Sequence, residues 1–306
     1  MDFSIIINSS LLDIQIASDL SPRDNKTLLS LVNDFEDTRW RSEKFIDFVW
    51  DNIAETALSF KERDALQAQP ASLLRNAAKN LRLTDSDKDI GKGSELAEIV
   101  LYGLMRHIYG ALPVVPKIFY KQNTQDNAKG ADSVHILLDD KDGFSLWFGE
   151  AKFYSSIEDA RLDSIVASVK ASLSTGKLKK ENAIITNVSD IDLLEIDSDV
   201  RNRIKSAISN KASIDTIKPL INVPILILHE CEITAAASEL SNSYNESIRE
   251  YHTQRAVAYF KKQLVSIGEM HKYGAIKFHL LLFPVPVKKP IVDLFVTGVR
   301  YYKGDS

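Results

Sequence analysis

Two apolar runs lie on either side of a short polar loop near the middle of the chain. Residues 134–138 and 144–153 are mostly hydrophobic, and the loop between them, residues 139–143, is Asp-Asp-Lys-Asp-Gly. Apolar runs of this length around a loop that ends in glycine predict a β-hairpin. If the five residues form the whole loop, Leu138 lies opposite Phe144, and counting back places Asp132 opposite Glu150.

The second strand of this hairpin is hydrophobic on both of its faces. Because successive side chains of a strand point to opposite faces, Phe148, Glu150 and Lys152 share one face, and Trp147 and Phe153 share the other. Apolar residues on both faces are typical of a central strand covered by helices on each side. The charges of Glu150 and Lys152 at one end of such a strand need partners, since burial of an unpaired charge is costly.

The patterns around the hairpin predict an α/β fold with a mixed sheet. Ser94 can cap a helix that runs to about Tyr109, and residues 117–121 are expected to form a short strand. After the hairpin, residues 156–173 are expected to form a helix and residues 183–186 a buried strand. The expected order is therefore helix, three strands, helix and strand, or αβββαβ.

The N-terminal part of the chain has a different pattern. Helical runs extend from residue 42 to 59 and from 71 to 81, and a polar stretch at residues 84–89 predicts a loop. These features divide the chain into a mainly helical region, residues 1–85, and an α/β domain with a C-terminal α/β extension, residues 86–306. The first region could be an inhibitory lid, a docking surface or a shell packed on the core.

Composition places the chain among ordinary globular proteins. It has 306 residues, of which 44% are hydrophobic and 26% are charged. Cys231 is the single cysteine, so an internal disulfide is excluded. The first residues form no basic leader, and no apolar run approaches the roughly 18 residues of a membrane span. A cytoplasmic protein is the expectation.

The distribution of charge is more informative than the net charge of −4. Residues 1–85 contain 10 Lys and Arg against 14 Asp and Glu, whereas residues 86–306 contain 28 of each. Proteins that bind long nucleic acid unaided usually have an excess of positive charge. A neutral core indicates weak binding of free nucleic acid, or a partner that delivers the substrate.

Opposed carboxylates in the hairpin indicate a metal site. Directly opposed residues of an antiparallel pair have Cβ atoms about 4.5–5.5 Å apart, close enough for Asp132 and Glu150 to share a divalent cation. Without a cation the two carboxylates would repel each other. Hard oxygen ligands favour Mg²⁺ or Mn²⁺ over zinc. The plainer alternative is a strand end at which Glu150 and Lys152 emerge into solvent.

Asp132 together with Glu150-Ala151-Lys152 resembles the motif of the PD-(D/E)xK, or restriction-endonuclease-like, nuclease superfamily. The chain has Ala131-Asp132 where the name of the motif has Pro-Asp. The resemblance implies a core of order αβββαβ, with a central mixed sheet flanked by helices, and a Mg²⁺-dependent phosphodiesterase in which Mn²⁺ can substitute. It implies that Asp132 and Glu150 bind the metal, with the Ala151 carbonyl as a possible backbone ligand. Lys152 would orient the attacking water or stabilise the developing charge.

The first helix of the superfamily fold often supplies a third carboxylate, and this chain offers Glu95 and Glu98. Glu98, Tyr102 and Arg106 follow one another at four-residue spacing, so a ligand at Glu98 would have polar neighbours. Glu95 lies in the first turn, where the helix dipole alone explains a carboxylate. Glu98 is therefore the preferred third ligand, or a carboxylate just behind the ligands, and Glu95 remains the alternative.

A closer resemblance, to the HamA family, covers most of the chain. It is carried by Gly-Ser-Glu-Leu-Ala-Glu-Ile-Val-Leu-Tyr at residues 93–102, Gly-Ala-Asp at 130–132, Phe-Gly-Glu-Ala-Lys-Phe-Tyr at 148–154 and Leu-Leu-Phe-Pro at 281–284. This resemblance implies the nuclease subunit of the Hachiman antiphage defence system, working with a superfamily 2 helicase partner of the HamB type that controls it. DNA is the expected substrate. The competing hypothesis is a catalytically silent nuclease fold that binds a helicase or nucleic acid. Neither resemblance distinguishes DNA from RNA or endonucleolytic from exonucleolytic cleavage.

Overall fold

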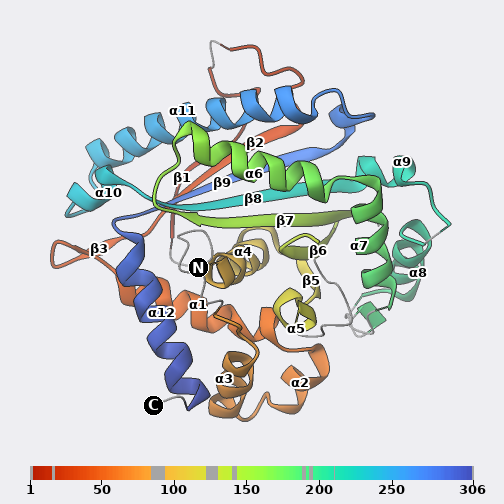
Figure 1. Ribbon diagram of the computed structural model, residues 1–306, viewed down its shortest axis with the longest axis horizontal. Helices are drawn as coiled ribbons and strands as arrows, with labels where there is room; N and C mark the ends of the chain where they lie inside the picture. The colour runs from red at the N-terminus through yellow and green to blue at the C-terminus, as the bar shows by residue number, and fades with distance from the viewer. Residues whose placement is uncertain are drawn as a thin grey trace.

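A seven-stranded mixed sheet lies between two layers of helices in the computed structural model (Figure 1). The strand order is β1-β2-β9-β8-β7-β6-β5. This architecture confirms the predicted α/β class with a central mixed sheet. The residues that the structure describes are 3–15, 18–83, 94–121, 130–139, 143–187, 191–192, 196–209 and 211–304.

Four adjacent strands, β2, β9, β8 and β7, run parallel, whereas β1, β6 and β5 are each antiparallel to their neighbours. A separate two-stranded ribbon consists of β3 and β4. The strands are β1 (Ser4–Ser10), β2 (Lys26–Val32), β3 (Phe35–Glu36), β4 (Arg39–Trp40), β5 (Leu112–Val115), β6 (Ser133–Leu138), β7 (Phe144–Tyr154), β8 (Ile221–Glu230) and β9 (Lys277–Val285).

Helices cover both faces of the sheet (Figure 1). One face carries α6 (Asp159–Ser172) and α11 (Asn242–Ile267), with α10 (Glu232–Ala236) beside α11. At the end of the sheet where β8 begins lie α7 (Thr175–Asn187), α8 (Ser198–Ala207) and α9 (Ile214–Ile217). The other face carries α1 (Ser42–Ala57), α2 (Phe60–Ala65), α3 (Pro70–Lys79), α4 (Ser94–Tyr109), α5 (Lys117–Lys121) and α12 (Lys288–Lys303). Two short 3-10 turns lie before strands: the turn Lys218–Leu220 precedes β8, and the turn Tyr273–Ala275 precedes β9.

Strand β7 is buried on both faces, as its sequence predicts. Leu146 and Phe148 belong to the core beneath α6 and α11, whereas Trp147 and Phe153 belong to the core around α1, α4 and α12. Gly149 allows α4 to pack closely here, because a Cβ at this position would lie 2.7 Å from Leu101 Cδ2. The strand that carries Glu150 is therefore held rigidly from both sides.

The two helices predicted beside the hairpin are confirmed. The first, α4, has the predicted bounds and buries ten consecutive residues, from Leu96 to Met105. The second, α6, begins at Asp159, slightly later than the predicted start at Ser156. Leu162, Ile165 and Val169 follow at helical spacing and pack on the sheet. These elements place the hairpin between two helices.

The strand predicted at residues 117–121 was wrong, because these residues form the short helix α5. The strand that precedes the hairpin is β5, which ends at Val115. Pro116 accounts for the change: the residue before a proline favours extended backbone, while proline itself suits the start of a helix. Pro116 O accepts the first hydrogen bond of α5, from Tyr120 N–H, at 3.1 Å.

The strand predicted at residues 183–186 was also wrong, because the segment lies inside α7. The α7 helix has buried residues at Leu178, Glu181 and Ile185, which recur every three to four positions as expected for a helix. A four-residue apolar run cannot by itself distinguish a strand from a helix. The parallel neighbour of β7 is instead β8, so α4, β5, β6, β7, α6 and β8 give the predicted order αβββαβ.

The N-terminal region contributes strands as well as the predicted helices. The helical runs of residues 42–59 and 71–81 correspond to α1 and α3. However, β2 pairs with β9, so strands from both sides of residue 85 share one sheet. The predicted boundary loop at residues 84–89 lies outside the described residues. Among the helices described, none is long and apolar enough to cross a lipid bilayer.

Candidate functional site

The β6–β7 hairpin has the register that its sequence predicts. Leu138 pairs with Phe144 and Ser133 pairs with Gly149. The ladder ends at the Ser133–Gly149 pair, and just beyond it Asp132 N–H donates to Gly149 O at 2.7 Å. Of the predicted loop, residues 140–142 lie outside the described part of the chain.

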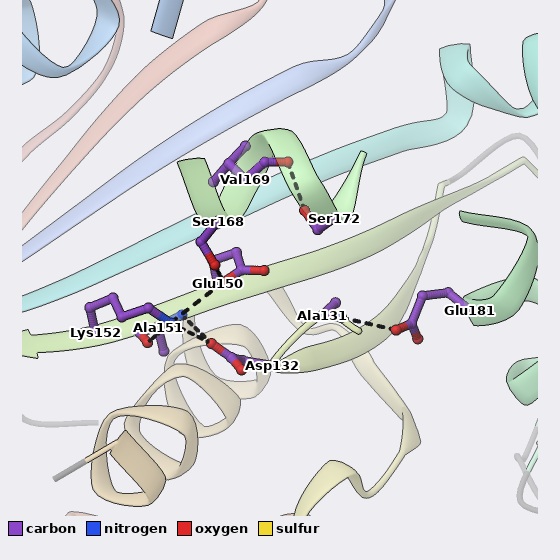
Figure 2. Close-up of polar contacts among 9 residues, drawn as sticks. All are labelled: Ala131, Asp132, Glu150, Ala151, Lys152, Ser168, Val169, Ser172 and Glu181. Carbon is purple, nitrogen blue, oxygen red and sulfur yellow. Dashed lines mark hydrogen bonds and ion pairs between the residues drawn. The ribbon is translucent and has the colours of Figure 1, made fainter. Parts of the chain in front are cut away.

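Three oxygen atoms of this hairpin converge on one positive charge, the Lys152 ammonium (Figure 2). Lys152 Nζ lies 3.2 Å from Asp132 Oδ2, 3.6 Å from Glu150 Oε2 and 3.0 Å from Ala151 O. The two opposed carboxylates therefore share a cation that the chain itself supplies, which relieves their mutual repulsion. The structure brings together all four residues of the predicted motif.

Each carboxylate also accepts a further hydrogen bond. Ala151 N–H donates to Asp132 Oδ2 at 3.1 Å, and Ser168 Oγ donates to Glu150 Oε2 at 2.7 Å. The Glu150 side chain is only 5% exposed, and that of Asp132 is 15% exposed. Their oxygens are held in place, but one side of the site is open to solvent.

The protonation state of Lys152 follows from its surroundings. Burial lowers the pKa of the ammonium, but the adjacent Asp132 and Glu150 outweigh that effect and raise the pKa above its ordinary value. Lys152 is therefore positively charged at neutral pH.

A pocket of about 290 Å³ opens beside the two carboxylates. Small side chains line much of it, which leaves space next to Asp132 and Glu150. Its lining residues are Gly130, Asp132, Glu150, Ser168, Ala171, Ser172 and Lys177. A larger hollow of about 740 Å³ lies between α1, β4 and the end of α4, but it mixes acidic and basic side chains and contains none of the motif.

The two candidate helical carboxylates have different environments. Glu95 accepts hydrogen bonds from the backbone N–H groups of Arg82 and Leu83, both at 2.9 Å, so it secures the segment before α4. Glu98 is 5% exposed on α4, which packs on the face of the sheet opposite α6. Within the described residues, no three Asp, Glu, His or Cys side chains form a group able to hold a metal ion. Asp132 and Glu150 thus form a close pair that Glu98 does not join.

Sequence reasoning missed Ser168 and Glu181, which hold the site from α6 and α7. Glu181 accepts a hydrogen bond from Ala131 N–H, directly before Asp132 (Figure 2). Both residues carried a signal: Ser168 lies three residues after buried Ile165, and Glu181 lies in the buried stripe of α7. The buried stripe that includes Glu181 could not be recognised while residues 183–186 were expected to form a strand, because the stripe depends on helical spacing.

Comparison with known proteins identifies one family. The model of the HamA family matches residues 6–299 of the 306-residue chain, so the match extends from β1 to α12. No curated protein matches the chain.

Proposed function

The chain belongs to the HamA family, and from this premise we propose that it is a divalent-metal-dependent nuclease that cleaves DNA. Family membership makes it a component of the Hachiman antiphage defence system. One observation supports the proposal most directly. Oxygens of Asp132, Glu150 and Ala151 converge on a single positive charge, and the two carboxylates line a pocket.

The residues present fit Mg²⁺ or Mn²⁺. Two carboxylates and a backbone carbonyl are hard oxygen donors, which these ions prefer. The Lys152 ammonium already satisfies the same three oxygens, so the site has the charge and the arrangement that a cation requires. Asp132, Glu150 and the Ala151 carbonyl would hold the metal, and Glu98 would act as a more distant carboxylate on α4.

Each residue has a separate task in phosphodiester hydrolysis. When bound, the metal would supply a water molecule of lowered pKa and neutralise charge on the phosphate. The Lys152 ammonium would donate a hydrogen bond to the attacking water or to a phosphate oxygen, where negative charge develops. Ser168 keeps Glu150 in one orientation through its 2.7 Å hydrogen bond. The adjacent pocket would admit the phosphate, with Lys177 at its wall.

A cation titration distinguishes the nuclease from the silent-module hypothesis. We expect calorimetry with Mn²⁺ alone to detect binding to the wild-type chain and none to Asp132→Ala. Asp163→Ala serves as a matched control, because Asp163 is an exposed carboxylate on α6 that pairs with Lys262. If the wild-type chain binds neither Mn²⁺ nor Mg²⁺, the metal-dependent mechanism is refuted and the silent-module hypothesis is favoured.

We further propose that a superfamily 2 helicase of the HamB type is the partner that controls this site. Membership of a multi-component defence system supports a partner, and the neutral charge of residues 86–306 supports weak binding of free DNA. The chain alone should therefore degrade DNA slowly, and the chain with its co-purified partner and ATP should degrade it fast. Equal, robust degradation in both samples would refute partner control but not nuclease activity.

A further inference from the structure

A buried ion pair contacts the backbone immediately before Asp132. Lys117 Nζ, on α5, is 2.6 Å from Glu181 Oε2, on α7, and the two side chains are 0% and 3% exposed. Removal of two charges from water is expensive, and a buried pair is often no more stable than apolar residues of the same size. General stability is therefore a weak explanation for this pair.

The second oxygen of Glu181 gives the pair a more specific role. Glu181 Oε1 accepts a hydrogen bond of 2.9 Å from Ala131 N–H, and Ala131 immediately precedes Asp132 (Figure 2). The approach depends on Gly130, because a Cβ there would lie 1.4 Å from the same oxygen. Lys117 pairs with Oε2 of the Glu181 carboxylate, and Oε1 of the same carboxylate accepts the hydrogen bond from the backbone N–H of Ala131.

Two consecutive backbone amides are consequently fixed on two different elements. Ala131 N–H is fixed on α7 through Glu181, and Asp132 N–H is fixed on β7 through Gly149 O. With both amides anchored, the Cα–Cβ bond of Asp132 has a fixed direction, and the carboxylate accepts hydrogen bonds from Ala151 N–H and Lys152 Nζ.

The hydrogen bonds around Lys117 extend to α4, the helix that carries Glu98. Lys117 N–H donates to the Tyr102 hydroxyl at 3.4 Å, and that hydroxyl donates to Val115 O. Tyr102 lies on α4, one turn after Glu98. Lys117 thus connects α4 and the end of β5 to the carboxylate that holds Ala131.

From these contacts we propose that Glu181 is a positioning residue for the metal site, and that Lys117 orients it. Glu181 sets the backbone before Asp132 so that the Asp132 carboxylate faces Glu150 at the separation that one cation can bridge. The proposal rests on the proposed metal-dependent function, whose failure the experiment below separates from its own.

A matched pair of double variants isolates the hydrogen bond to Ala131. Lys117→Met/Glu181→Gln and Lys117→Met/Glu181→Met both remove the buried charges, and their new side chains have similar lengths. Only the first retains an oxygen that can accept from Ala131 N–H. We expect Mn²⁺ affinity close to wild type for the Gln variant and about 10–100-fold weaker affinity for the Met variant, the usual effect of losing an outer partner of a metal ligand. Wild-type affinity in a folded Met variant would overturn the proposal.

Hydrogen exchange at the Ala131 amide provides a readout that needs no metal. Exchange should be fast in the Met variant and slow in the Gln variant, with melting curves confirming that both are folded. Gly130→Ala gives an independent check if the Met variant does not fold, because the added methyl would displace Glu181 from Ala131 with both charges retained. If the wild-type protein does not bind Mn²⁺, the proposed metal-dependent function is refuted. Independently of that result, equal exchange rates of the Ala131 amide in all variants would overturn the positioning role of Glu181.

Discussion

At the scale of single residues, Lys152 allows two carboxylates to lie close together at the end of the hairpin. Its ammonium contacts Asp132, Glu150 and the Ala151 carbonyl at 3.0–3.6 Å. These residues could be predicted because a hairpin register depends on local sequence alone. Helical spacing places Ser168 and Glu181 near the buried stripes of α6 and α7. No local pattern indicates which residues of the hairpin they contact, so their roles could not be predicted.

Replacement of Lys152 should separate catalysis from metal binding. We expect Lys152→Met to lower the DNA-cleavage rate by ~10²–10⁴, the range for loss of a positioned catalytic group. Mn²⁺ binding should persist, since Asp132 and Glu150 then have no other bridging cation. Lys289→Met is the control, because Lys289 is 82% exposed on α12. A folded Lys152→Met protein that cleaves DNA at the wild-type rate would contradict the assignment.

The two helical carboxylates should differ in what their replacement changes. Glu98→Gln should weaken cleavage and cation binding, because Glu98 is the proposed more distant carboxylate of the metal site and is buried on α4. Glu95→Gln should mainly lower the melting temperature, since Glu95 accepts from Arg82 N–H and Leu83 N–H. Paired measurements of cleavage rate and melting temperature test this. The opposite result, with Glu95→Gln the more damaging to cleavage, would transfer the catalytic role to Glu95.

At the scale of elements, long periodic segments could be predicted and short ones could not. The α4 helix and the β6–β7 hairpin extend over enough residues for their periods to be clear. Residues 117–121 and 183–186 are short, and their neighbours decide their structure: Pro116 starts α5, and the buried stripe of α7 includes Ile185. The parallel partner of β7 also lies far along the chain, and long-range pairing leaves no local signal.

Close packing of α4 on β7 can be tested at Gly149. A Cβ there would lie 2.2 Å from Ser133 Oγ and 2.7 Å from Leu101 Cδ2, so Gly149→Ala should push α4 away from the sheet. We expect the free energy of unfolding to fall by about 1–3 kcal/mol, the usual cost of overpacking. Gly176→Ala, where nothing lies within 4 Å of the added Cβ, is the control and should not destabilise α7. Chemical denaturation of both variants measures the difference, and equal stabilities would contradict this packing account.

At the scale of the whole molecule, residues 1–85 and 86–306 contribute to the same sheet and the same two cores. Leu28 of β2 packs in the core beneath α11, and Leu29 packs in the core around α1 and α4. Deletion of residues 1–85 should therefore yield insoluble protein, since a large apolar surface would be exposed. Expression and sedimentation of the truncated chain test this. A soluble, folded truncation with released nuclease activity would instead identify the region as an inhibitory lid.

Asp132, Glu150 and Lys152 form the proposed nuclease site, and one assay tests this assignment most directly. The DNA-degradation rate of the chain with its co-purified partner, Mg²⁺ and ATP should be compared between wild type, Glu150→Gln and Asp163→Asn. Glu150→Gln should fall to the level that wild type shows with a metal chelator, whereas Asp163→Asn, altered at an exposed carboxylate of α6, should match wild type. Wild-type degradation by folded Glu150→Gln, or degradation that persists in chelator, would contradict the account.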